Sequence, residues 1–129
     1  MSYKILIVDD SPLMRAMVKK SIAIAGIPTE SIQEAGHGVE ALAILKASPI
    51  DLVFSDLHMP EMNGIELVEA MASQGLLKSI PVVIVSSDRS QKHIARLKEI
   101  GVRAYLTKPF RPEDISQVFK IVFGSSEGA

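Results

Sequence analysis

Short apolar runs rich in Val, Ile and Leu alternate with longer amphipathic segments through the whole chain. This alternation is typical of βαβ units, in which parallel strands are joined by helices that cover both faces of the sheet. Five rounds of the pattern predict an α/β fold with five parallel strands and five helices. The expected strands are residues 4–8, 31–35, 51–55, 82–86 and 103–107, and the second is polar enough to indicate an edge. The expected helices are residues 12–25, 39–47, 65–74, 91–100 and 112–123.

Residues that favour helix ends agree with this division. Ser11 is a good N-cap, and Pro12 stands at the first helical position, where a backbone N–H has no partner within the helix. Gly26 and Gly101 follow the first and fourth expected helices, where a residue in the left-handed conformation commonly ends a helix.

The length of 129 residues fits a single domain, which we expect at residues 1–124 with a flexible tail at residues 125–129. No linker is visible, so we expect no second, output domain. The chain has no cysteine, which excludes disulfides and thiolate metal sites. Its net charge of −1 predicts affinity for neither nucleic acid nor membranes. Asp9 interrupts the N-terminal apolar run too early for a signal peptide, so we expect a cytoplasmic protein.

The expected strands are followed by charged or hydroxyl side chains. Asp9, Asp10, Asp56, Ser86 and Lys108 all lie at or just after the carboxyl end of a strand. In open parallel sheets, ligands bind at this edge, where the strand order reverses. If the first and third strands are neighbours, about 5 Å apart, three carboxylates converge there.

The repulsion within such a cluster must be offset, because the two carboxylates of each pair repel each other by roughly 3 kcal/mol at an effective dielectric constant of about 20. Raised pKa values, a cation or both can offset it. An all-oxygen site with few protein ligands suits Mg²⁺, which also accepts phosphate oxygens. With Lys108 and Ser86, the set contains the groups that phosphoryl transfer to a carboxylate requires. Each residue alone has an ordinary explanation as a cap, turn or loop residue, and only the combination indicates a site.

Four segments resemble the signature segments of bacterial response-regulator receiver domains. They are ILIVDDS, VFSDLHMPEMNG, PVVIVSS and AYLTKPF, in the family's order and at its separations. The resemblance covers about residues 3–123 and is closest to the stand-alone, chemotaxis-type (CheY-like) regulators. It implies a flavodoxin-like, doubly wound sheet with strand order 2-1-3-4-5 and a phosphorylation-activated switch of a two-component system or phosphorelay.

The resemblance also implies roles for the acidic residues. Asp56 would accept a phosphoryl group from a sensor histidine kinase or phosphotransfer protein. Asp9 and Asp10 would hold Mg²⁺ together with Asp56 and the backbone carbonyl of His58. The residues alone do not distinguish Asp56 from Asp9 as the nucleophile.

Three further residues match positions that, in members of the family, respond to the phosphoryl group or contact it. Ser86 matches the switch hydroxyl, and Tyr105 matches the aromatic residue whose rotamer follows the switch. Lys108 matches the lysine that contacts the phosphoryl group, and the family typically has a cis peptide at the position of Lys108–Pro109. Such a protein phosphorylates and dephosphorylates itself and is not an enzyme with ordinary substrate turnover.

The family commonly binds protein targets through its fourth helix, fifth strand and fifth helix. In the last helix expected here, Ile121 lies roughly 130° from the centre of the apolar stripe, so we expect it to be exposed. We expect a monomer that contacts a downstream protein through this surface, with weak dimerisation through the last helix as the alternative. Neither nucleic acid nor a membrane is an expected partner.

His58 and Asp88 lie two residues after Asp56 and Ser86. In the family these positions influence the lifetime of the acyl phosphate, although a solvated imidazole explains His58 equally well. A zinc site built from His58 and the aspartates would have to rely on one imidazole, because neither His37 nor His93 is expected near the acids.

Three other functions compete with the switch. A haloacid-dehalogenase-type phosphohydrolase carries a second acid two residues after its nucleophile, where this chain has His58. A flavodoxin has a Ser-, Thr- and Gly-rich phosphate loop after its first strand, where this chain has Asp9 and Asp10. A structural module that has lost the chemistry would not require the complete set of site residues. The phosphorylation switch is therefore the principal hypothesis.

Overall fold

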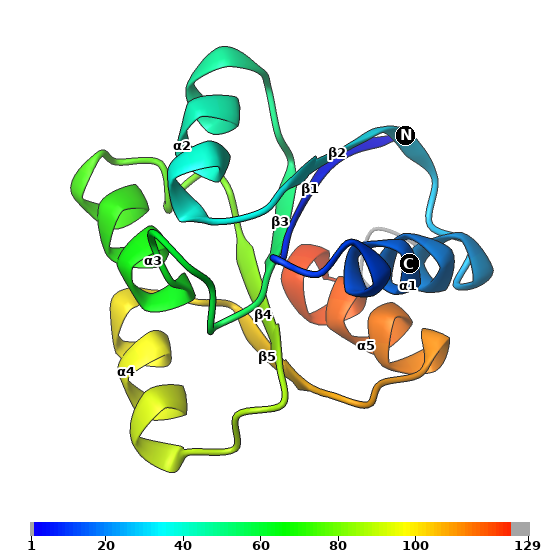
Figure 1. Cartoon of the computed structure of the whole chain (residues 1–129). Helices are drawn as coiled ribbons and strands as arrows, with labels where there is room; N and C mark the ends of the chain where they lie inside the picture. The colour runs from blue at the N-terminus through cyan, green and yellow to red at the C-terminus, as the bar shows by residue number, and fades with distance from the viewer. Residues whose placement is uncertain (1, 125–129) are drawn as a thin grey trace.

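The computed structural model describes residues 2–124, which form five strands and five helices in strict alternation (Figure 1). The tail expected at residues 125–129 lies outside the described residues. The strands are β1 (Tyr3–Val8), β2 (Thr29–Ala35), β3 (Leu52–Ser55), β4 (Val82–Ser86) and β5 (Ala104–Thr107). The helices are α1 (Pro12–Ile24), α2 (Gly38–Ala47), α3 (Gly64–Ser73), α4 (Gln91–Ile100) and α5 (Pro112–Phe123).

The five strands are parallel and lie in the order β2-β1-β3-β4-β5, which confirms the expected doubly wound sheet. The polar strand β2 is at an edge, as its composition indicated. Helices α2, α3 and α4 cover one face, and α1 and α5 cover the other (Figure 1). The molecule therefore has three layers, with the sheet in the middle.

The alternation of side chains along β1 produces a core on each face of the sheet. Ile5 and Ile7 pack in the cluster on the side of α1 and α5, whereas Leu6 and Val8 pack in the cluster beneath α2, α3 and α4. All four side chains are essentially inaccessible to solvent. Because successive strand residues point to opposite faces, a strand buried on both sides must be apolar throughout.

Helix α1 has the expected residues at its ends, and α3 has a capping box that was not predicted. The Ser11 hydroxyl accepts a hydrogen bond from the Met14 N–H at the start of α1. At the start of α3, Asn63 and Glu66 form a reciprocal capping box, each side chain bonding the other residue's backbone N–H. Gly26, after α1, has a φ of 77°, in the left-handed region that favours glycine.

Strand ends differ from the sequence expectation by up to two residues. Strand β2 begins at Thr29 because this segment pairs with β1, although its first residues are exposed and polar. Asp51 lies just before β3, where its carboxylate accepts the Lys4 N–H at 2.8 Å. Arg103 likewise precedes β5. None of these differences affects the carboxyl ends of the strands.

The start of α3 lies against the backbone that carries the end of β3. The Gly64 N–H donates to the Leu57 carbonyl at 2.8 Å. A Cβ atom at Gly64 would lie 2.5 Å from the Asp56 carbonyl oxygen and 2.9 Å from the Leu57 Cα. Both neighbours are backbone atoms that cannot rotate away, so only glycine allows this close approach.

We expect Gly64→Ala to destabilise the protein by about 1–3 kcal/mol, the usual cost of overpacking. Gly36→Ala is the matched control, because its Cβ would meet only the Glu40 carboxylate at an ordinary 3.6 Å. The control should change the free energy of unfolding by less than about 0.5 kcal/mol. Urea denaturation measures both values, and equal stability of the two variants would contradict the packing argument.

Candidate functional site

Three carboxylates meet at the carboxyl ends of β1 and β3. Asp9, Asp10 and Asp56 each offer an oxygen atom, and these oxygens lie within 4.8 Å of one another. Asp9 is 4% exposed, Asp56 is partly buried, and Asp10 is exposed. The convergence expected if β1 and β3 were neighbours is therefore observed.

Backbone hydrogen bonds position two of these carboxylates. The Asp56 N–H donates to the Val8 carbonyl at 2.8 Å, which continues the pairing of β3 with β1 beyond the strand end. The Leu57 N–H donates to Asp56 Oδ1 at 2.8 Å, and the Ser11 N–H donates to Asp9 Oδ1 at 2.9 Å. Each side chain is thus oriented by the chain that follows it.

Lys108 brings one positive charge to the cluster from the loop after β5. Its Nζ lies 3.2 Å from Asp9 Oδ2 and 3.7 Å from Asp56 Oδ1. The Lys108 N–H donates to the Ser86 carbonyl at 2.9 Å, so the ends of β4 and β5 hold this lysine in place. The Lys108–Pro109 peptide is cis, as the family resemblance implied.

Burial raises the pKa of the Asp56 carboxyl above its ordinary value, and the nearby Asp9 carboxylate adds to the effect. The Lys108 ammonium, the Leu57 N–H and the Ser86 hydroxyl oppose it without cancelling it. The ionised form of Asp56 is therefore disfavoured in the folded protein.

The donor set fits Mg²⁺. Three carboxylates and one ammonium leave a formal charge of −2 at the site when all are ionised. A divalent cation neutralises that charge, and carboxylate and carbonyl oxygens are the ligands that Mg²⁺ prefers.

Ser86 and Tyr105 are both linked to the backbone of Asp88. The buried Ser86 hydroxyl accepts the Asp88 N–H at 3.2 Å, and the Tyr105 hydroxyl donates to the Asp88 carbonyl. Burial raises the pKa of the Tyr105 phenol, so it stays protonated and able to donate. The two residues expected to act as a switch thus both bind the backbone of Asp88.

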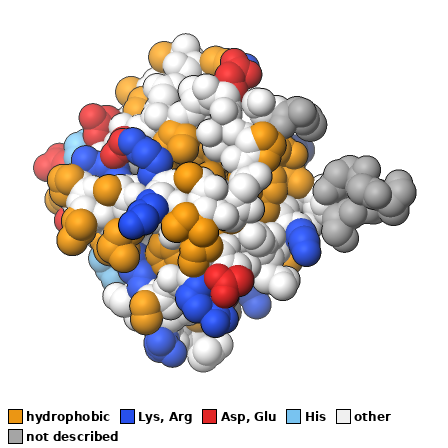
Figure 2. All heavy atoms as spheres, turned by 90° about the vertical axis from the view of Figure 1, so that its right-hand side faces the viewer, with side chains coloured by type: hydrophobic (Ala, Val, Ile, Leu, Met, Phe, Trp, Pro, Cys, Tyr) orange, Lys and Arg blue, Asp and Glu red, His pale blue; other side chains and the backbone are white. Residues whose placement is uncertain are grey.

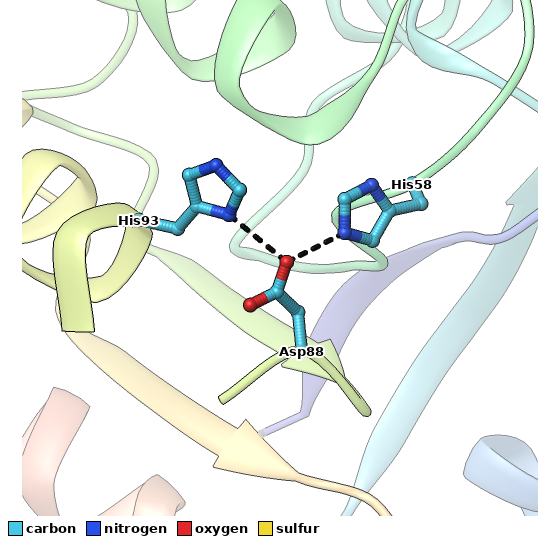
Figure 3. Close-up of side chains that lie close together, drawn as sticks. All are labelled: His58, Asp88 and His93. Carbon is cyan, nitrogen blue, oxygen red and sulfur yellow. Dashed lines mark hydrogen bonds and ion pairs between the residues drawn. The ribbon is translucent and has the colours of Figure 1, made fainter. Parts of the chain in front are cut away.

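His93 lies beside His58 and Asp88, and this position was not predicted from the sequence. The side chains of His58, Asp88 and His93 point toward one another from two loops and the start of α4 (Figure 3). The sequence placed no imidazole other than His58 near the acids, and it gave no sign that His93 would contact Asp88. Side chains in a helix tilt toward its N-terminus, so the third residue of α4 reaches back over the loop that contains Asp88.

Comparison with known proteins shows one consistent family. The family model described as the response regulator receiver domain matches residues 5–120. Chemotaxis protein CheY1 of Helicobacter pylori is 34% identical over 125 residues, which cover 96% of this chain and 99% of that protein. The CheY homolog of Campylobacter jejuni is 32% identical over 97% of this chain and 95% of its own length.

The comparison with solved structures indicates the same family as the sequence comparison. The structure of the chemotaxis protein CheY4 of Vibrio cholerae superimposes with a TM-score of 0.83 at 32% sequence identity, over 95% of this chain and 100% of that one. Within residues 2–124, no helix has the length and apolar character needed to cross a membrane.

The raised pKa of Asp56 predicts a pH-dependent cost to stability. The folded state binds the Asp56 proton more tightly than the unfolded state, so stability falls as pH rises from the ordinary carboxyl value through the raised one. In a metal-free buffer at neutral pH, Asp56→Asn should therefore raise the free energy of unfolding by about 0.5–2 kcal/mol.

This difference should shrink as the pH is lowered toward the ordinary carboxyl pKa of 3.8. Asp51→Asn, at the exposed opposite end of β3, is the matched control and should leave stability nearly unchanged at neutral pH, because the asparagine side-chain oxygen can still accept the Lys4 N–H. Urea denaturation at several pH values measures these effects. A variant less stable than the wild type at neutral pH would contradict the assignment.

Proposed function

Because this chain belongs to the response regulator receiver domain family, the phosphorylation-activated switches of two-component signalling, we propose that Asp56 is its phospho-acceptor. The observation that carries the proposal is the position of Asp56 at the end of β3, beside two further carboxylates and the Lys108 ammonium. Asp9 is an inferior candidate because it is almost fully buried.

The chemistry is the transfer of a phosphoryl group from a phosphohistidine to a carboxylate. An Asp56 oxygen attacks phosphorus, the P–O bond forms, and the P–N bond to the donor imidazole breaks. We assign the attack to Oδ2, because the Leu57 N–H and Lys108 Nζ both engage Oδ1. Lys108 and Ser86 stabilise the charge on the transferred group.

We assign the Mg²⁺ ligands to Asp9, Asp10, Asp56 and the backbone carbonyl of His58. When bound, the ion would neutralise the charge of the cluster and of the incoming phosphoryl oxygens. Asp9 is held by the Ser11 N–H, whereas Asp10 is exposed and free to adjust its side chain. The rigid and the adjustable ligand together suit an ion that keeps several waters.

Phosphorylation is proposed to shift the protein between two states through Ser86 and Tyr105. If Ser86 turns toward the phosphoryl group, its hydrogen bond from the Asp88 N–H is lost. The Asp88 carbonyl binds Tyr105, so the tyrosine responds to the same displacement. Such a change is a population shift between conformations that differ in partner affinity.

The proposed output surface is formed by α4, β5 and α5. Tyr105, Val118 and Ile121 line one hollow in this surface, together with the charged residues Lys98 and Arg103. Exposed hydrophobic residues alone would not select it, because α1 also exposes large apolar side chains. Figure 2 shows hydrophobic side chains interspersed with charged ones on the side of the molecule that carries α1 and α5. The link through Tyr105 is what favours the α4-β5-α5 surface.

The expected partners are a sensor histidine kinase or phosphotransfer protein and a downstream protein target. The similarity to chemotaxis proteins supports a target in that kind of pathway. We propose a cytoplasmic monomer that acts through protein contacts and turns over no ordinary substrate. Dimerisation through α5 is the alternative use of the same surface.

The phospho-acceptor is tested by intact mass after incubation with acetyl phosphate and Mg²⁺. The wild type should gain about 80 Da, the mass of one phosphoryl group, and Asp56→Asn should gain nothing. Asp51→Asn keeps the acid cluster and should gain the same mass as the wild type. A persistent adduct in Asp56→Asn would move the acceptor to another residue.

The output surface is tested by Ile121→Lys, which places a charge on a side chain that is 65% exposed. We expect about tenfold weaker binding of the downstream partner or weaker self-association, equivalent to about 1.4 kcal/mol. Ile24→Lys is the matched control, since Ile24 is 61% exposed but lies on α1. Titration calorimetry and sedimentation measure the two contacts, with phosphorylation checked by mass. If both variants behave alike, the surface assignment fails.

A further inference from the structure

His58, Asp88 and His93 form a compact cluster of nitrogen and oxygen donors beside the acid site (Figure 3). His58 Nε2 lies 2.7 Å from Asp88 Oδ2, and His93 Nδ1 lies 2.9 Å from the same oxygen. His58 comes from the loop after β3, Asp88 from the loop after β4, and His93 from α4. Two imidazoles from separate elements thus bind the same carboxylate oxygen.

Hydrogen bonds hold the Asp88 carboxylate in place. The Ser90 N–H donates to Oδ1 at 2.7 Å, which leaves Oδ2 directed at the two imidazoles. The carboxylate oxygen therefore needs no reorientation before it binds a cation between the two imidazoles.

The imidazoles are accessible from solvent, in contrast to the carboxylate. The Asp88 side chain is 13% exposed, whereas the side chains of His58 and His93 are 64% and 38% exposed. An ion can therefore reach the donor atoms from outside, and the rings can adjust around it. This arrangement differs from the acid site, where Asp9 and Lys108 are largely buried.

The donor set is typical of zinc. Two imidazole nitrogens and one carboxylate oxygen, with a fourth position for water, form a familiar three-ligand zinc site. Tetrahedral geometry with metal–ligand bonds of about 2.0–2.1 Å places ligand atoms about 3.3 Å apart. The present separations from Asp88 Oδ2 are 2.7 and 2.9 Å, and all three donor atoms lie within 4.8 Å of one another, so modest ring movements would bring them to this spacing. In the metal-free protein the same atoms form hydrogen bonds.

We propose that His58 Nε2, His93 Nδ1 and Asp88 Oδ2 bind a divalent transition-metal ion of the zinc type. The site is separate from the Mg²⁺ site because no ligand side chain is shared between them. Selection between the two metals follows from donor chemistry, since imidazole favours zinc and carboxylate and water favour magnesium. The ion joins the loop after β3 to the start of α4.

The test is a zinc titration of the full chain in excess Mg²⁺, with a chromophoric chelator as competitor. The wild type should bind one zinc ion, and His93→Asn and His58→Asn should each weaken binding at least about tenfold. His37→Asn is the matched control, because His37 caps α2 and asparagine is also a good N-cap. The control should bind zinc like the wild type, and circular dichroism checks that every variant is folded.

A second arm separates this site from the acid cluster. Asp56→Asn should retain zinc binding, so the result stands even if Asp56 proves not to be the phospho-acceptor. Cobalt substitution should give the visible absorption of a tetrahedral site in the wild type and lose it in His93→Asn. Zinc binding abolished by Asp56→Asn and unaffected by His93→Asn would overturn the proposal, as would a wild type that takes no zinc from the chelator.

Discussion

The parallel pairing of β1 with β3 is the constraint on which the site depends. The hydrogen bond from the Asp56 N–H to the Val8 carbonyl places the residues that follow β1 beside the end of β3. Asp9 and Asp56 are then neighbours whatever their mutual repulsion. Burial and repulsion by Asp9 disfavour the charged form of Asp56, and Lys108 offsets this effect only in part. The fold thus maintains a cluster that favours protons, cations or a phosphoryl group held by cations.

A rigid sheet holds the carboxylates together despite their repulsion. Strands buried on both faces hold their ends in fixed positions, so each short loop needs to orient only one or two side chains. Ser86 and Tyr105 are the exception, because both depend on the backbone of Asp88, which belongs to a loop. The rigid part of the site holds the charges, and the part that can rearrange lies between the acids and the α4-β5-α5 surface.

The sequence predicts the helices closely because their ends have local signals. Ser11 and Pro12 begin α1 as expected, and α4 and α5 have the expected bounds. The edge strand is predicted less well, since Thr29 and Glu30 are exposed and adopt the strand conformation through pairing with β1. The acid cluster follows from the strand ends once β1 and β3 are neighbours. The order of the strands came from the family resemblance, because periodicity says nothing about which strands pair.

His93 shows why the remaining part of the site could not be predicted. It is an ordinary polar residue of an amphipathic helix, and its sequence context carries no signal for a ligand. His93 lies near His58 only because of how α4 is placed relative to the loop after β3, and this placement depends on tertiary packing. Asp88 connects the two regions: its carboxylate faces the imidazoles, and its backbone faces Ser86 and Tyr105. Whatever binds the carboxylate therefore acts on the same segment that phosphorylation is proposed to move.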